Sequence, residues 1–164
     1  MSRFMISAAG KSSGKTLVSM GLCRALADAG HIVQPFKKGP DYIDPMWLGA
    51  ASGKPCFNLD FNTMSNTELA DFFQNRRVLD GVNIVEGNKG LYDGVDLHGK
   101  DCNAALAALL DLPVVLVINC SGITRGIAPL LNGYAAFGDD IDFTGVILNN
   151  VGGARHHGKL VRVI

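Results

Sequence analysis

The sequence predicts a three-layer α/β fold built on a mostly parallel central sheet. Short apolar runs alternate with helical patterns about five times along the chain, which is typical of parallel strands joined by crossover helices. The run 113–119 (PVVLVIN) is continuously apolar, as in strands buried on both faces of a sheet, and 143–149 (FTGVILN) is another apolar strand pattern. Hydrophobic residues make up 48% of the 164 residues, enough for one substantial core.

The expected elements follow from local patterns along the chain. Gly30 ends the first helical pattern, and Ser65 with Glu68 three residues later forms a capping-box pattern at the start of the second. Pro35 indicates that its strand lies at a sheet edge or bends. Residues 46–64 are mixed in pattern, and the chain after residue 150 shows no closing element. We expect strands at 3–9, 31–37, 82–86, 113–119 and 143–149, and helices at 16–29, 65–79, 102–110 and 124–137.

Composition argues against several classes of protein. The formal net charge is zero, so nothing favours nucleic acid or an anionic membrane as the main partner. No apolar run has the length of a membrane span, and the amino terminus does not resemble a signal peptide, so we expect a cytoplasmic protein. The four cysteines are far apart, which argues against disulfides and zinc. His98, His156 and His157 lack ligand spacing and are expected at the surface.

Residues 8–16, AAGKSSGKT, lie between the first predicted strand and the first predicted helix. They end in GKT, as phosphate-binding loops do, although Ala9 stands where the first glycine is usual. Backbone N–H groups of such a loop and the positive end of the helix dipole face phosphate oxygens. We expect Lys15 to contact the β- and γ-phosphates of ATP and Thr16 to bind Mg²⁺. Lys11 is either a further phosphate contact or a solvated lysine.

Two further loops place charged residues where the second and third predicted strands end. KKGPDYIDP, beginning at Lys37, contains Asp41, and VEGNKGLYDG contains Glu86 and Asp93. Ligands of parallel α/β sheets bind beyond the carboxyl ends of the strands. A carboxylate at this edge is suited to Mg²⁺, and Lys37 is suited to neutralising a phosphoryl group or a substrate carboxylate. We therefore expect both loops to meet the phosphate site.

Three long stretches resemble signatures of the cobyrinic acid a,c-diamide synthase family, from the dethiobiotin-synthetase-like branch of P-loop proteins. They are residues 34–60, 85–94 and 145–156. The resemblance implies a P-loop NTPase fold and an enzyme that uses ATP and Mg²⁺ to phosphorylate a side-chain carboxylate of a tetrapyrrole. Ammonia then displaces the phosphate to form an amide. The ammonia comes from glutamine, which a carboxyl-terminal amidotransferase domain with a cysteine nucleophile hydrolyses.

The resemblance also implies roles for individual residues. Asn149 would read the adenine edge, and Asp41, Glu86 and Thr16 would hold Mg²⁺. Lys15, Lys37, Asp44 and Asp93 would act in catalysis around the acyl phosphate. The remaining expected contacts are those of the phosphate loop with ATP (Gly10, Lys11, Ser12, Ser13, Gly14, Lys15 and Thr16) and those with the substrate (Tyr42, Asp44, Leu91, Tyr92 and Asp93).

The sequence departs from the family pattern at several positions. Ala8 stands where this branch, whose loop is one residue longer, commonly has glycine, and Asn150 stands where arginine is typical. Asn88 and Lys89 replace residues that are usually apolar, which leaves open another tetrapyrrole such as sirohydrochlorin or sirohaem. We expect residues 1–164 to form the synthetase domain, incomplete at its carboxyl end, without the amidotransferase domain.

Two alternatives and two partners follow from these features. A nucleotide-dependent switch ATPase of the same fold often has a lysine five residues before the loop lysine, but that position is Gly10, and Lys11 is one residue off. An inactive fragment that binds nucleotide weakly is the other alternative. We expect a glutaminase domain or subunit as partner, and a homodimer is compatible with the sequence.

Overall fold

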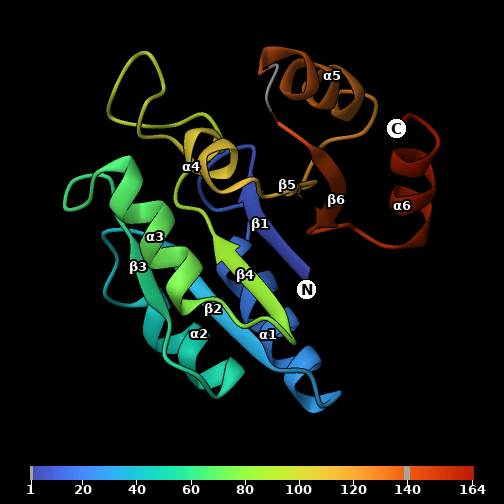
Figure 1. Ribbon diagram of the computed structural model, residues 1–164. Helices are drawn as coiled ribbons and strands as arrows, with labels where there is room; N and C mark the ends of the chain where they lie inside the picture. Colours follow the sequence, from blue (N-terminus) through green and yellow to red (C-terminus); the bar gives the residue numbers. More distant parts are fainter. Residues whose placement is uncertain (1, 139–140) are drawn as a thin grey trace.

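In the computed structural model, which describes residues 2–138 and 141–164, six strands form one parallel sheet (Figure 1). Their order is β3-β2-β4-β1-β5-β6, so the first strand lies inside the sheet and later strands extend it on both sides. All five neighbouring pairs are parallel. The strands are β1 (Ser2–Ala8), β2 (Val33–Lys38), β3 (Phe57–Leu59), β4 (Val82–Glu86), β5 (Val114–Asn119) and β6 (Phe143–Asn149).

Helices cover both faces of the sheet and complete the predicted three layers (Figure 1). Cys23 of α1 and Leu48 of α2 share one apolar cluster with Ile6 and Ile84 of the sheet. The larger cluster lies on the other face and takes apolar side chains from α3, α4, α5 and α6. The helices are α1 (Lys15–Asp28), α2 (Asp44–Ser52), α3 (Asn66–Arg76), α4 (Asn103–Leu110), α5 (Ile127–Phe137) and α6 (Ala154–Val161).

The central strands are buried because helices cover both of their faces. Every residue of β2 is buried, including Lys37 and Lys38. Phe36 and Phe73 pack with ring centroids 4.9 Å apart and join β2 to α3. By contrast, β6 at the sheet edge is only partly buried. No helix in the described part of the chain is both long and apolar enough to cross a membrane.

Three elements were not predicted. Helix α2 and strand β3 occupy the stretch that is mixed in sequence, and α6 follows residue 150. Each is too short for its periodicity to be distinctive: β3 has 3 residues, and α6 has 8, with Gly158 among them. His156, near the start of α6, is partly buried, and its Nδ1 accepts a hydrogen bond from the N–H of Gly152.

Two predictions differ in part from the structure for identifiable reasons. Strand β2, which contains Pro35, is an interior strand, and β3 forms the edge. Proline is tolerated because the pairing of β2 with β3 begins only at Phe36. The helix expected to reach residue 79 ends at Arg76. The Asn83 side chain binds both the N–H and the carbonyl of Val78, at 2.9 Å each, and so directs the chain into β4.

The predicted capping box at the start of α3 is present. The Ser65 hydroxyl accepts a hydrogen bond from the N–H of Glu68, and the Glu68 carboxylate accepts one from the N–H of Ser65. We expect Ser65→Ala to lower the free energy of unfolding by about 1 kcal/mol, because the N–H of Glu68 loses its acceptor and the Glu68 carboxylate loses the hydroxyl that helps to hold it. Urea denaturation measures the change. Ser65→Thr keeps the hydroxyl and should retain most of the stability, and an unchanged midpoint for the alanine variant would contradict this account.

Candidate active site

The charged residues predicted to meet do so at the carboxyl ends of β1, β2 and β4. These strands are neighbours in the sheet, and Lys37 of β2 stands directly beside Glu86 of β4 in the parallel register. Ile6 of β1 flanks Glu86 on the other side. Because α1 begins immediately after the loop that leaves β1, the helix amino terminus points at the same edge. The topology alone therefore brings three loops to one place.

The loop between β1 and α1 has the backbone of an anion-binding turn. Ser12 and Gly14 have positive φ angles of 57° and 88°, which turn successive N–H groups to one side. The Ser13 hydroxyl donates to the carbonyl of Gly10 at 2.9 Å and closes the turn. Gly14 is the N-cap of α1, and no side chain caps the helix there. The first N–H groups of α1 are thus left for a ligand.

Lys15 points across this loop instead of into solvent. Its side-chain nitrogen donates to the carbonyl of Lys89 at 2.6 Å, and the residue is only 8% exposed. Burial, and next the positive charge of Lys37, lower the pKa of Lys15, and the nearby carboxylates offset this only in part. An ammonium group has three donors, so two remain for phosphate oxygens while the Lys89 carbonyl holds the third. Lys11 is exposed.

Lys37 is the centre of a buried cluster of charges. Its nitrogen lies 2.6 Å from a carboxylate oxygen of Asp44 and 3.0 Å from Oε1 of Glu86, and it is 3% exposed. The Thr16 hydroxyl donates to the same Glu86 oxygen at 2.7 Å and lies 3.2 Å from Asp44. The cluster therefore joins β2, β4, α1 and α2. It forms directly at the amino terminus of α1.

Lys37 and Asp44 hold each other in their charged forms. Burial alone would lower the pKa of Lys37, but the charge of Glu86 and the hydrogen bonds with Asp44 and Glu86 outweigh it and raise that pKa. Burial alone would raise the pKa of Asp44, but the hydrogen bond and charge of Lys37 outweigh it and lower that pKa. Lys37 is therefore a fixed cation and Asp44 a fixed anion at neutral pH.

The residues present fit a magnesium ion that is completed by phosphate oxygens. The second carboxylate oxygen of Glu86, Oε2, is buried and has no hydrogen-bond partner in the described part of the chain. Thr16 and Asp44 are in hydrogen-bond contact beside it. No group of three or more acidic, histidine or cysteine side chains that could hold a metal occurs among the described residues. One or two carboxylates with substrate phosphates is the usual way in which proteins bind Mg²⁺.

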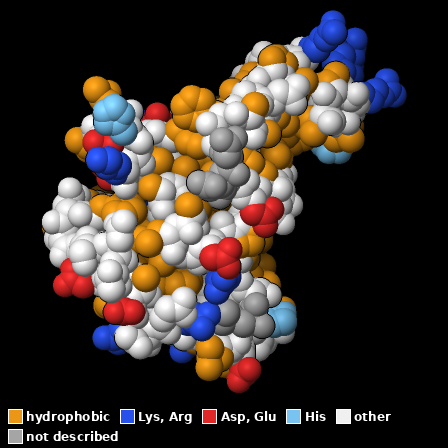
Figure 2. Space-filling view, turned by 45° about the horizontal axis from the view of Figure 1, so that its top comes forward, with side chains coloured by type: hydrophobic (Ala, Val, Ile, Leu, Met, Phe, Trp, Pro, Cys, Tyr) orange, Lys and Arg blue, Asp and Glu red, His pale blue; other side chains and the backbone are white. Residues whose placement is uncertain are grey.

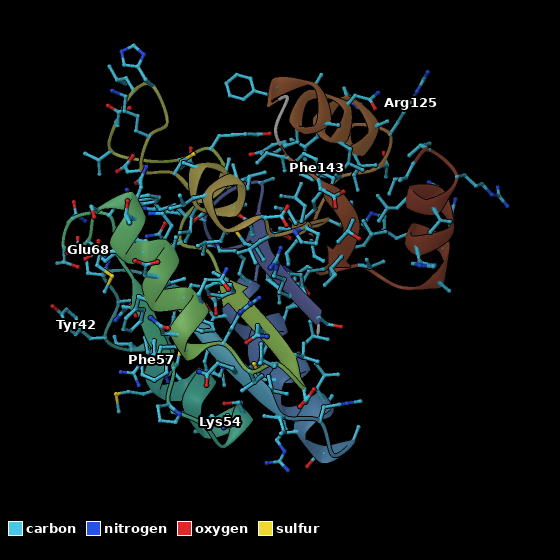
Figure 3. All side chains as sticks on the ribbon, in the orientation of Figure 1. Tyr42, Lys54, Phe57, Glu68, Arg125 and Phe143 are labelled. Carbon is cyan, nitrogen blue, oxygen red and sulfur yellow. The ribbon has the colours of Figure 1, made fainter. Side chains whose placement is uncertain are left out.

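Asp41, which the sequence suggested as a metal ligand, is engaged in shaping its own loop. One carboxylate oxygen accepts hydrogen bonds from the N–H groups of Ile43 and Asp44, and the other lies 3.9 Å from the nitrogen of Lys37. Asn58 of β3 holds the loop from the opposite side through both backbone groups of Asp41. Of the two aspartates, it is Asp44 that the structure brings to Thr16. Tyr42 projects away from the body of the protein and is 85% exposed (Figure 3).

The loop after β4 continues along β1 and is closed by Asp93. The N–H of Leu91 bonds the carbonyl of Ala8 at 2.8 Å, and the Asp93 carboxylate accepts from the N–H of Gly90 at 3.1 Å. A Cβ at Gly90 would lie 2.4 Å from that carboxylate and 3.2 Å from the carbonyl oxygen of Ala9, so a side chain there would displace Asp93. Leu91 itself is completely buried in the larger core. Its side chain packs in that core and is not among the residues that line the neighbouring cleft.

A partly apolar cleft of about 560 Å³ opens beside Asp93. Tyr92 and Phe137, with ring centroids 4.8 Å apart, form one wall, and the exposed Leu97 contributes to another. The Tyr92 hydroxyl donates to the carbonyl of Tyr134, whose own hydroxyl donates to the carbonyl of Ala9 at the start of the phosphate loop. The cleft and the phosphate loop thus share Tyr134 as a supporting residue. Figure 2 shows hydrophobic side chains exposed on one face of the protein.

Asn149, predicted to read adenine, lies against the phosphate loop. Its amide donates to the carbonyl of Ser13 at 2.9 Å, and Gly14 is so close that a Cβ there would lie 2.2 Å from the amide nitrogen. Next to it, the Asn150 amide donates to Asn119 at the end of β5. Three amide side chains therefore gather at the carboxyl ends of β5 and β6, beside the loop.

Sequence reasoning missed several residues that hold the site together. They are Asn58, Asn103 and Tyr134, each of which binds backbone groups of a site loop from another element. Asn58 and Tyr134 carry no motif, and their roles depend on distant contacts. Asn103 directly follows Cys102 at the start of a predicted helix, and an asparagine there is a signal for side-chain contacts with a loop.

Comparison with known proteins identifies the family of the chain. Residues 4–164 match the model of the CobQ/CobB/MinD/ParA nucleotide binding domain. The chain belongs to this family. It is 46% identical over 162 residues, 99% of its length, to a cobyrinate a,c-diamide synthase of Magnetococcus marinus. It is 47% identical over 162 residues to a hydrogenobyrinate a,c-diamide synthase of Brucella ovis and 43% identical over 166 residues to a cobyrinate a,c-diamide synthase of Methanosarcina acetivorans.

These relatives are longer than the chain. The alignments cover 98–99% of this chain but 35%, 37% and 33% of the respective relatives, so the chain spans about a third of their length. The resemblance to a,c-diamide synthases and the P-loop type of fold predicted from the sequence are confirmed. The family description also establishes a nucleotide-binding domain.

Gly14 provides a direct test of the loop geometry. We expect Gly14→Ala to lower the free energy of unfolding by about 1 kcal/mol or more, because its φ of 88° disfavours a side chain and the added Cβ displaces the Asn149 amide. Gly10→Ala in the same loop is the matched control, since a Cβ there meets no atom within 4 Å. Thermal or urea unfolding compares the two. Equal stability of the two variants would contradict the described loop.

Proposed function

We propose that the domain activates a side-chain carboxylate of cobyrinate, or of the closely related hydrogenobyrinate, as an acyl phosphate in an ATP- and Mg²⁺-dependent amidation. The observation that supports this most strongly is the buried Lys37 held between Asp44 and Glu86 at the phosphate loop. A fixed cation that is already paired can face added phosphate charge without a change in its own protonation. Sequence identity of 43–47% to named diamide synthases supports the choice of substrate.

Each residue has a role that follows from its position. Lys15 and the N–H groups of residues 10–16 would bind the phosphates, and Thr16 with Glu86 would hold Mg²⁺. A bound magnesium ion supplies charge neutralisation and orientation of the phosphate oxygens. We assign Asp44 rather than Asp41 as the further acidic residue beside the metal, because Asp44 contacts Thr16 and Asp41 caps its own loop. Asn149 would face the adenine side of the loop.

The reaction has two balanced steps. A carboxylate oxygen of the substrate attacks the γ-phosphorus, the bond to the β-phosphate oxygen breaks, and ADP leaves. Ammonia then attacks the acyl carbon, the bond from that carbon to the phosphate oxygen breaks, and the leaving phosphate takes up the proton that the nitrogen loses as the amide forms. Lys37 and Lys15 would stabilise charge on the transferred phosphoryl group, and the site's main contribution is positioning.

We place the substrate in the cleft beside Asp93. Its apolar walls, formed by Tyr92, Phe137 and Leu97, suit the body of a tetrapyrrole. Asp93 lines the cleft, and its carboxylate binds the N–H of Gly90 in the loop whose Lys89 carbonyl holds Lys15. Tyr42, on the exposed rim of the loop before α2, is the further proposed substrate contact. We propose that a glutaminase domain or subunit supplies the ammonia. We propose further that residues 1–164 form the synthetase domain.

The function is tested by incubating the protein with ATP, Mg²⁺, an ammonium salt and cobyrinate or hydrogenobyrinate, with amide products detected by mass spectrometry. We expect amides to form, and Lys15→Ala to abolish them while lowering ATP affinity at least about tenfold, since a charge-assisted contact is lost. Lys11→Ala removes an exposed lysine of the same loop and is the matched control. ATP turnover that ignores both tetrapyrroles, or unchanged ATP affinity of Lys15→Ala, would refute the proposal.

A further inference from the structure

Asn103 is a completely buried polar residue with no proposed contact to nucleotide, metal or substrate. It is the first residue of α4, its exposure is 0%, and its amide lies under the loop after β4. Its oxygen accepts a hydrogen bond from the N–H of Asn88 at 3.1 Å, and its nitrogen donates to the carbonyl of Gly90 at 2.8 Å. The same nitrogen contacts the carbonyl of Asn88 and, at 3.2 Å, the buried hydroxyl of Ser7.

These contacts clamp the residues on both sides of Lys89. The peptide groups of Asn88 and Gly90 are bound to one side chain, so the backbone between them has little freedom. Lys89 accordingly has a positive φ of 45°, which is uncommon for a residue other than glycine. In this conformation its carbonyl oxygen lies 2.6 Å from the side-chain nitrogen of Lys15.

Gly87 shows how closely the amide approaches the loop. A Cβ at this position would lie 2.7–2.9 Å from the carbon, nitrogen and oxygen of the Asn103 amide. Real Cβ atoms are essentially never that close to another heavy atom. The absence of a side chain at Gly87 is therefore a condition for the clamp, and it explains the glycine directly after Glu86.

We propose that Asn103 is a positioning residue for Lys15: it fixes the Lys89 carbonyl, which in turn holds the Lys15 ammonium group at the phosphate site. Two of the three ammonium donors then face the phosphates with their direction already set. This inference rests on the proposed nucleotide site but concerns a residue that contacts no reacting group. It requires only two sets of contacts: those of Asn103 with the backbone on both sides of Lys89, and that of the Lys89 carbonyl with Lys15.

The protein contains a matched control in Asn83. This asparagine is also 0% exposed, and its amide likewise binds both backbone groups of one residue, Val78. It lies near the opposite, amino-terminal end of β4, away from the phosphate loop. Asn103→Asp and Asn83→Asp make the same chemical change, replacing an amide that donates with a carboxylate that only accepts. Both are expected to lower stability, since each leaves backbone carbonyls without a donor.

The two variants are expected to differ at Lys15. In the nucleotide-free protein, Asn103→Asp should shift the NMR resonance of the Lys15 side-chain nitrogen, whereas Asn83→Asp should leave it in place. With nucleotide, Asn103→Asp should weaken ATP binding about tenfold, the loss expected when one charge-assisted contact is misplaced. AMP affinity should stay the same, because this lysine reaches the β- and γ-phosphates, which AMP lacks.

Several outcomes would overturn the inference. An unchanged Lys15 resonance in Asn103→Asp, equal losses of ATP affinity in the two variants, or equal losses of ATP and AMP affinity would each do so. If Asn103→Asp does not fold, Gly87→Ala displaces the same amide and carries the same expectations. A shifted Lys15 resonance in a protein whose wild type does not bind ATP would uphold the clamp and refute the proposed function.

Discussion

The site depends on one interaction, the buried ion pair between Lys37 and Glu86. These residues stand opposite each other on neighbouring parallel strands. The Lys37 side-chain nitrogen lies 3.0 Å from Oε1 of Glu86, and both side chains are almost completely buried. Either charge alone at this depth would be strongly unfavourable, so each needs the other. The Thr16 hydroxyl donates to Glu86, and Lys37 also donates to Asp44 and to the carbonyl of Gly87. Through these hydrogen bonds the start of α1 and the start of α2 are attached to the centre of the sheet.

Around this pair, three loops are each held by an asparagine from a different element. Asn58 of β3 holds the backbone of Asp41, Asn103 of α4 holds that of Asn88 and Gly90, and Asn149 of β6 holds the carbonyl of Ser13. An amide side chain is suited to this because it can donate and accept at once, and so can bind both groups of a peptide unit. Loops that must face a ligand thus gain order without a covering element.

The sequence predicts the alternation of strands and helices and the meeting of three loops, because long apolar strands and crossover connections leave few topologies. It also predicts Thr16, Lys37 and Glu86 together, since strand register brings strand ends to one edge. It does not predict which aspartate meets Thr16, because that depends on where the short helix α2 begins. The sequence also does not predict the contacts of the loop-holding asparagines, since these join residues as far apart as 13 and 149. The short elements β3 and α6 lack enough periods to be recognised.

The central claim is that the Lys37–Glu86 pair serves the binding of MgATP and is not kept for stability alone. The most direct measurement is the stability and MgATP affinity of Lys37→Met and of the double variant Lys37→Met/Glu86→Gln. Lys37→Met should lose about 3–5 kcal/mol of unfolding free energy, because it leaves a buried charge unpaired. The double variant should recover much of that stability and still fail to bind MgATP. A double variant that binds MgATP as the wild type does would contradict the account.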